Sequence, residues 1–127
     1  MGCISLFFDG SSKGNLGMVG VRGVYFNSEN IEMKEYAWGI DKKTNNGAEW
    51  LALIKGLELA RKEGIEELTV FGDSCMVIGE ARNLVRNRKS PITKTHHLLK
   101  CMENEYKAIN FLHILRENNT HVDRMAN

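Results

Sequence analysis

The sequence has few cysteines, which could cross-link the fold, and few prolines, which interrupt helices and strands. Proline occurs once, at Pro91, and cysteine three times, at Cys3, Cys75 and Cys101. Three is an odd number, and the cysteines stand at no metal-ligand spacing, so a disulfide framework is not indicated. We expect buried, reduced thiols in a reducing compartment and no disulfide-linked partner.

The chain also lacks an excess of charge of either sign. Its 17 Lys and Arg residues stand against 16 Asp and Glu residues, which gives a formal net charge of +1. The field of the whole molecule therefore gives no argument for nucleic-acid binding, and any basic surface has to be local. No run approaches the roughly 18 apolar residues of a membrane span, and the N-terminus has no signal-peptide pattern. We expect a cytoplasmic protein that does not contact membranes.

Length and composition are those of an ordinary globular domain. The 127 residues are 43% hydrophobic and 26% charged. A chain of this size can bury one hydrophobic core without disulfides or structural metals to stabilise it. We expect a single domain over residues 1–127 and a monomer.

The chain begins with an apolar run, Cys3–Ser12, that contains an aspartate, Asp9. Apolar residues fall on both faces of the expected strand, which is typical of a strand inside a sheet that is covered on both sides. An ionised aspartate at the end of such a run is costly unless a partner neutralises it. Either the chain turns to solvent after Asp9, or a cation meets this carboxylate.

The rest of the pattern predicts an α/β fold. We expect strands at Met18–Phe26, Ile31–Ile40, Glu66–Gly72 and Ala108–Leu115, and helices at Asn46–Lys62, Asp73–Val85, Thr93–Lys107 and from Asn119 onward. Short turns join the first three strands into an antiparallel meander, whereas the helical crossover makes the next strand parallel to an earlier one. The result is a mixed five-stranded sheet with the first strand in the centre, flanked by helices.

A stripe of small residues marks one face of the helix expected at Asn46–Lys62. Ala52, Gly56 and Ala60 recur on it at helical spacing, which lets the helix lie close against the sheet. Glu49 begins the same stripe, so we expect its carboxylate to point toward the sheet.

Each of four acidic residues has an ordinary explanation when it is taken alone. Asp9 belongs to an Asp-Gly pair, which is typical of turns. Glu49 stands three residues after Asn46, as in a capping box. Asp73 and Asp123 stand where the start of a helix favours a carboxylate.

Their placement in the expected fold favours a shared site instead. Asp9 and Asp73 follow neighbouring central strands, at the sheet edge where sites form in α/β folds. Glu49 heads a helix packed on that sheet, and Asp123 can reach the same edge from the terminal helix. Such a cluster repels itself unless a divalent cation neutralises it, and its oxygen ligands favour Mg²⁺ or Mn²⁺. Two metals about 4 Å apart are the usual arrangement for displacement at phosphorus.

Four short runs carry a family resemblance. They are Phe8–Ser11 (FDGS), Thr44–Glu49 (TNNGAE), Gly72–Ser74 (GDS) and Arg116–Ala126 (RENNTHVDRMA). In this order and spacing they resemble the four motifs of type 1 ribonuclease H, including its reverse-transcriptase-like subfamily. The resemblance covers essentially the whole chain and implies the ribonuclease H-like fold.

The resemblance implies that Asp9, Glu49, Asp73 and Asp123 are catalytic and hold two Mg²⁺ ions, with Mn²⁺ as a substitute. By analogy, Asp9 bridges both ions, Glu49 and Asp73 hold one and help to orient the attacking water, and Asp123 holds the other. The implied reaction is endonucleolytic hydrolysis of the RNA strand of an RNA/DNA hybrid, which leaves a 3′-hydroxyl and a 5′-phosphate.

The resemblance also implies a set of small and polar residues that contact the hybrid. They are Gly10, Ser11, Ser12, Asn15, Thr44, Asn45, Asn46 and Ser74. The positions that match minor-groove contacts, where 2′-hydroxyls distinguish RNA from DNA, are Ser11, Asn15, Asn45 and Asn46. Thr44 matches a contact with a DNA phosphate, and Ser74 heads a helix with free amides. Turn or cap formation is the ordinary alternative for each asparagine.

The chain departs from the family pattern in two places. Many members carry a histidine-containing loop before the terminal helix, and this loop is missing here. We interpret His113 as a structural residue of the last strand, whereas a role for His121 stays open. The basic run Arg82–Lys89 lies where some relatives grip the hybrid, but it is short and more typical of a solvated helix face.

Two other functions remain open from the sequence. One is a hybrid-binding domain of the same fold that is catalytically weak or inactive. The other is a different nuclease or transposase-type enzyme of this fold.

Overall fold

The structure is a computed structural model that describes residues 3–13, 18–40 and 45–119, with side chains for residues 3–10, 20–39 and 47–119. Its elements are β1 (Ile4–Lys13), β2 (Met18–Phe26), β3 (Glu32–Ile40), α1 (Asn45–Lys62), β4 (Glu67–Gly72), α2 (Cys75–Val85), α3 (Lys94–Glu103), β5 (Ala108–His113) and a 3₁₀ turn (Arg116–Asn118). This order is the predicted one up to the terminal helix, which lies outside the described residues apart from Asn119. Among the helices of the described ranges, none is long and apolar enough to cross a membrane.

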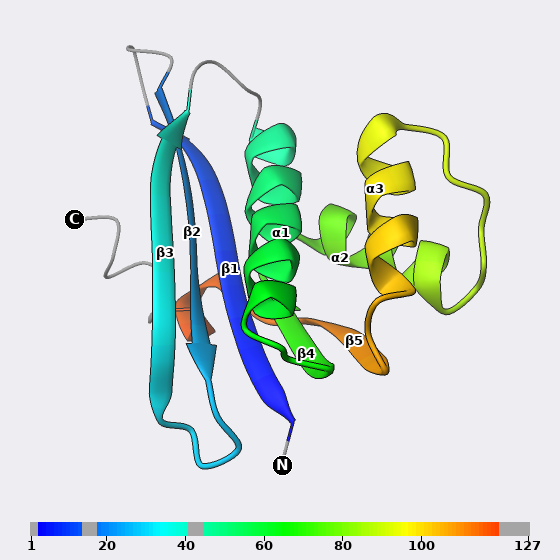
Figure 1. Ribbon diagram of the computed structural model, residues 1–127. Coiled ribbons are helices and arrows are strands. Elements are labelled where there is room, and N and C mark those ends of the chain that lie inside the picture. Colours follow the sequence, from blue (N-terminus) through cyan, green and yellow to red (C-terminus); the bar gives the residue numbers. More distant parts are fainter. Residues whose placement is uncertain (1–2, 14–17, 41–44, 120–127) are drawn as a thin grey trace.

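The five strands form one mixed sheet in the order β3-β2-β1-β4-β5 (Figure 1). β1 pairs antiparallel with β2 and parallel with β4, and β4 pairs parallel with β5. The predicted central place of β1 is therefore confirmed. Two strands that run parallel end at the same edge of the sheet, which is the edge that carries the acidic residues.

The two faces of the sheet are covered differently. The helices that the structure describes, α1, α2 and α3, stand on one side of it (Figure 1). On the other side Phe7 stacks on Phe71 with ring centroids 4.6 Å apart, and it meets Phe26 edge-on at 5.6 Å. Within the part of the chain that the structure describes, helices thus cover one face of the sheet, and these aromatic side chains lie on the other. Aromatic rings explain why β1 is apolar on the second face.

The small-residue stripe brings α1 against the sheet, as predicted. A Cβ atom added at Gly56 would lie 2.6 Å from Leu6 Cδ2 and 2.6 Å from Tyr36 Oη, so any other residue would have to displace these side chains. Tyr36 Oη donates to Ala52 O at 2.7 Å, and Tyr25 Oη donates to Gly56 O at 2.5 Å. Tyrosine hydroxyls from two strands thereby fix the position of α1 along the sheet.

Two elements end earlier than the sequence predicts. α3 ends at Glu103 because Tyr106 leaves the helix and donates its Oη hydrogen to Leu57 O at 2.5 Å. β5 ends at His113 because its parallel partner β4 ends at Gly72, the residue with which His113 pairs. In both cases the boundary is set by a distant segment and not by the local pattern.

The prediction of buried cysteines is wrong. Cys3, Cys75 and Cys101 are all exposed, and none is in a disulfide. Cys3 precedes β1, Cys75 is the first residue of α2, and Cys101 belongs to α3. Larger apolar side chains fill the core, so these small thiols are left at the ends and outer faces of their elements.

Candidate active site

Three of the four predicted carboxylates come together at one edge of the sheet. Asp9 lies on β1, Glu49 lies on α1, and Asp73 follows the last residue of β4. One carboxylate oxygen from each lies within 4.8 Å of the other two. Asp9 is 4% exposed and Glu49 is 8% exposed, so two carboxyl groups are largely removed from water. The fourth residue, Asp123, lies outside the described residues.

Gly10 brings Asp9 next to Glu49. A Cβ atom added at Gly10 would lie 2.3 Å from the carbonyl carbon and oxygen of Ala48 and 2.6 Å from the amide nitrogen of Glu49. Only a glycine lets the backbones of β1 and α1 approach in this way. The turn interpretation of Asp9 is wrong, because β1 continues past it and pairs Asp9 with Arg22 of β2.

Asp73 is level with Asp9 because their strands are parallel neighbours. The register pairs Phe7 with Phe71, and each aspartate follows two residues later. The residue that caps α2 is Ser74, whose Oγ accepts from the amide of Val77 at 3.3 Å. The interpretation of Asp73 as a simple N-cap is therefore wrong, and its carboxylate is available to the site.

Glu49 points into the cluster and not toward the start of its own helix. α1 already includes Asn45 and Asn46, so Glu49 belongs to the second turn and the capping-box interpretation is wrong. Burial raises the pKa of Glu49 to about 9, helped by a hydrogen bond to the Asp9 carboxyl group and by the negative charges of Asp9 and Asp73. A backbone hydrogen bond from Gly10 opposes this rise. Without a cation, Glu49 therefore holds a proton at neutral pH.

The cluster fits a hard divalent cation. Glu49 Oε2 is buried and has no hydrogen-bond partner among the described side chains and backbone. Carboxylate oxygens of Asp9 and Asp73 lie within 4.8 Å of a carboxylate oxygen of Glu49, so oxygen donors from three residues converge here. Oxygen donors of this kind suit Mg²⁺ or Mn²⁺, although the arrangement does not by itself choose between them.

Comparison with known families agrees with this geometry. A family model described as reverse transcriptase-like matches residues 7–127. The chain belongs to the reverse-transcriptase-like family of ribonuclease H domains. A bifunctional protein of Mycobacterium tuberculosis is 31% identical over 120 residues, which are 94% of this chain and 33% of that protein. Ribonuclease HI of Halobacterium salinarum is 27% identical over 126 residues, which are 99% of this chain and 63% of that protein. The chain thus spans about a third of the mycobacterial relative.

Solved structures of the ribonuclease H family show the same fold. The N-terminal RNase H domain of the mycobacterial protein has a TM-score of 0.81 at 28% identity, over 95% of this chain and 88% of that one. LC11-RNase H1, solved in complex with an RNA/DNA hybrid, has a TM-score of 0.82 at 25% identity, over 95% of this chain and 91% of that one. The predicted ribonuclease H-like fold is confirmed.

Asn119 belongs to the acidic site of this ribonuclease H domain, although the sequence analysis treated it only as the start of a helix. It is fully buried, and its Nδ2 donates to Phe8 O at 3.2 Å and to Asp73 Oδ2 at 3.1 Å. The side chain therefore ties the middle of β1, next to Asp9, to the carboxylate that follows β4. A sequence signal was present, since Asn119 stands inside the fourth family motif, four residues before Asp123.

The predicted hybrid contacts of the domain stay predictions. Gly10 is buried against the backbone of α1, and Ser74 caps α2. Ser11 and Ser12 lie on β1, and Asn45 and Asn46 begin α1, without described side chains. Outside the described residues lie Asn15, Thr44 and His121.

The basic run Arg82–Lys89 begins in α2 and continues beyond its end. Arg86, Arg88 and Lys89 are exposed, whereas Arg82 is half-buried. Exposure of this kind suits a solvated face and a nucleic-acid contact equally, so both interpretations stay open.

Proposed function

We propose that this domain is a ribonuclease H that hydrolyses the RNA strand of RNA/DNA hybrids with two bound divalent cations, leaving a 3′-hydroxyl and a 5′-phosphate. The observation that carries the proposal is the convergence of Asp9, Glu49 and Asp73 within 4.8 Å at one edge of the sheet. Membership of the family and the hybrid bound to LC11-RNase H1 support the substrate.

The cations are assigned to Asp9, Glu49 and Asp73, with Asp123 as a further ligand from the terminal segment. When bound, they activate the attacking water and stabilise the charge on the leaving oxygen. The side chains supply position and charge. Glu49 gives up the proton that it shares with Asp9, and Asn119 holds the Asp73 carboxyl group in place.

The hybrid is assigned to the surface around the same sheet edge. The proposed contacts are Gly10, Ser11, Ser12, Asn15, Thr44, Asn45, Asn46 and Ser74. The start of α1 and the start of α2 both flank the carboxylates, so a phosphate backbone that lies across this edge passes over the site. Contacts with 2′-hydroxyls would select the RNA strand.

The test is cleavage of a hybrid labelled on either strand. Purified protein should cut only the RNA strand with Mg²⁺ or Mn²⁺ and not with a chelator. Asp9→Asn should lower the rate by about 100-fold or more, because it removes a charge that holds the cations. The control is Glu67→Gln, which changes an exposed carboxylate at the start of β4 and should leave the rate unchanged.

Other outcomes favour the other functions. Wild-type protein that binds the hybrid and never cuts it, with either metal, would identify a binding domain of this fold. Cleavage of duplex DNA in preference to the hybrid would identify a different nuclease.

A further inference from the structure

Side-chain atoms of Cys75 and His113 that could ligate a metal lie close together beside the acidic site. Cys75 is the first residue of α2 and His113 is the last residue of β5, and both are exposed. The Cys75 Sγ atom lies 3.2 Å from His113 Nε2. The same Nε2 lies 3.2 Å from the backbone oxygen of Asp73. Three potential ligand atoms thus meet at one exposed point, two of them from the segment that leads from β4 into α2 and one from the end of β5.

The donor chemistry of this group differs from that of the carboxylates. Thiolate and imidazole favour thiophilic or borderline cations such as Zn²⁺ and Cd²⁺ over Mg²⁺. Tetrahedral zinc, with bonds of about 2.3 Å to sulfur and 2.0 Å to nitrogen, holds these two atoms about 3.5 Å apart. The observed separation of Cys75 Sγ and His113 Nε2 is 3.2 Å, so a small rotation gives a binding geometry. A backbone oxygen and solvent can complete the coordination.

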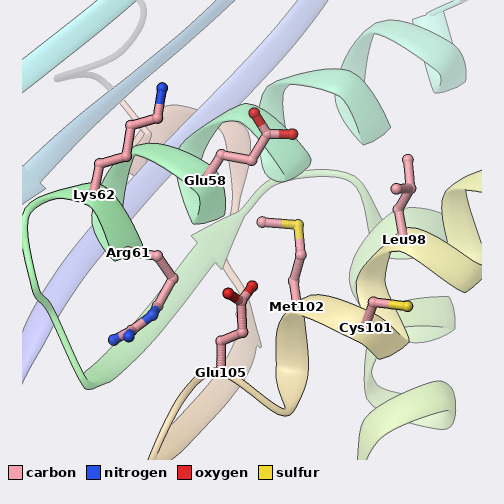
Figure 2. A pocket seen from close by; sticks show the side chains of 7 residues that line it. All are labelled: Glu58, Arg61, Lys62, Leu98, Cys101, Met102 and Glu105. Atoms are coloured by element: carbon pink, nitrogen blue, oxygen red, sulfur yellow. The ribbon is translucent and has the colours of Figure 1, made fainter.

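Exposure of a thiol alone does not make such a site, and Cys101 shows the difference. Cys101 lines a hollow of about 410 Å³ between α1 and α3, with Leu98 and Met102 beside it. Figure 2 shows these side chains together with the other residues that line this hollow, and no histidine is among them. Among the described residues Cys101 forms no hydrogen bond with a histidine, although His97 lies one helical turn before it in α3. Cys101 is therefore a control for an exposed cysteine whose thiol is not hydrogen-bonded to an imidazole.

We propose that Cys75, His113 and the backbone oxygen of Asp73 bind a thiophilic divalent cation such as Zn²⁺, and that this cation inhibits the domain. Binding releases the thiol proton to solvent and draws the Asp73 peptide toward the cation. The Asp73 side chain extends from the same residue to Asp9 and Glu49, so the acidic cluster loses its geometry. The inhibitory effect rests on the proposed function, whereas binding at this site does not.

Binding is tested with Cd²⁺ as the probe, in saturating Mg²⁺ so that the carboxylates are occupied. Ultraviolet thiolate-to-cadmium absorption should saturate at one ion per chain in wild type and in Cys101→Ser. Cys75→Ser should lose the signal, and His113→Ala should bind at least about 10-fold more weakly. An unchanged signal in Cys75→Ser, or unchanged affinity in His113→Ala, would overturn the site. This readout is decisive even if the domain does not cleave hybrids.

Inhibition is tested with Zn²⁺ in the hybrid-cleavage assay at saturating Mg²⁺. Wild type and Cys101→Ser should be inhibited together, and Cys75→Ser should need about 10-fold more Zn²⁺ for the same inhibition. Equal inhibition of Cys75→Ser and wild type would show that Zn²⁺ acts at the carboxylates, and it would overturn the inhibitory role. The activity of Cys75→Ser without Zn²⁺ serves as the reference. Cys75 is not among the residues proposed to hold the catalytic cations or to contact the hybrid.

Discussion

Without metal, replacing Glu49 by glutamine should raise the free energy of unfolding relative to wild type at neutral pH. In the folded state the pKa of Glu49 is about 9, against an ordinary value of 4.5, because the carboxyl group is buried beside Asp9 and Asp73. The folded protein therefore binds this proton more tightly than the unfolded chain does. The stability that comes from the protonated form is complete below pH 4.5 and is lost as the pH rises toward 9.

The size of the effect follows from the shift. Between the ordinary pKa of 4.5 and pH 7, each pH unit lowers the free energy of unfolding by about 1.4 kcal/mol, or roughly 3 kcal/mol in all. Glu49→Gln has no proton to lose at this position, so its free energy of unfolding does not fall with pH for this reason. Its advantage over wild type should therefore be smallest near pH 4.5 and grow by roughly 3 kcal/mol by pH 7.

The measurement is urea unfolding in a chelator at several pH values. Glu67→Gln, the same change at an exposed position, should follow the wild-type pH dependence. Adding Mg²⁺ should stabilise wild type and have much less effect on Glu49→Gln, since the variant has lost an anionic ligand. If the unfolding free energies of Glu49→Gln and wild type run parallel from pH 4.5 to 7, the unfavourable ionisation of Glu49 is refuted.

Three further results are expected from the packing. Gly10→Ala should destabilise the fold by about 1–3 kcal/mol and abolish cleavage, because its methyl group meets the α1 backbone. The control is Gly79→Ala, since no atom lies within 4 Å of a Cβ added there. This variant should be neutral or stabilising in the same urea assay. Asn119→Ala should cost about 1–3 kcal/mol and weaken Mg²⁺ binding, measured by calorimetry, because it removes the hydrogen bond from Asn119 Nδ2 to the Asp73 carboxyl group. Unchanged Mg²⁺ affinity would contradict this. Burial raises the pKa values of Tyr25 and Tyr36 well above 10, so stability should fall above pH 10 and tyrosinate absorbance should appear only on unfolding.

The fold was predictable wherever a pattern within one element decided it. Alternation marks the strands, helical spacing marks the stripe of α1, and the hand of the crossover orders the sheet. The ends of α3 and β5 were not predictable in this way, because Tyr106 bonds to Leu57 and β5 follows the end of β4. The exposure of the cysteines was missed for a related reason, since residue type gives the preference for burial and not the face on which a residue lies.

In the candidate site, too, some features follow from a local sequence pattern and others from contacts between distant residues. Asp9 and Asp73 each had an ordinary role available, and a neighbour decides against it: β1 pairs with β2 beyond Asp9, and Ser74 caps α2 so that Asp73 does not. Asn119 reaches Phe8 across 111 positions of the chain, a contact that no local pattern indicates. The acidic residues are thus recognisable from spacing and motif, whereas the residues that hold them in place depend on contacts that form only when β1, α1 and β4 have come together.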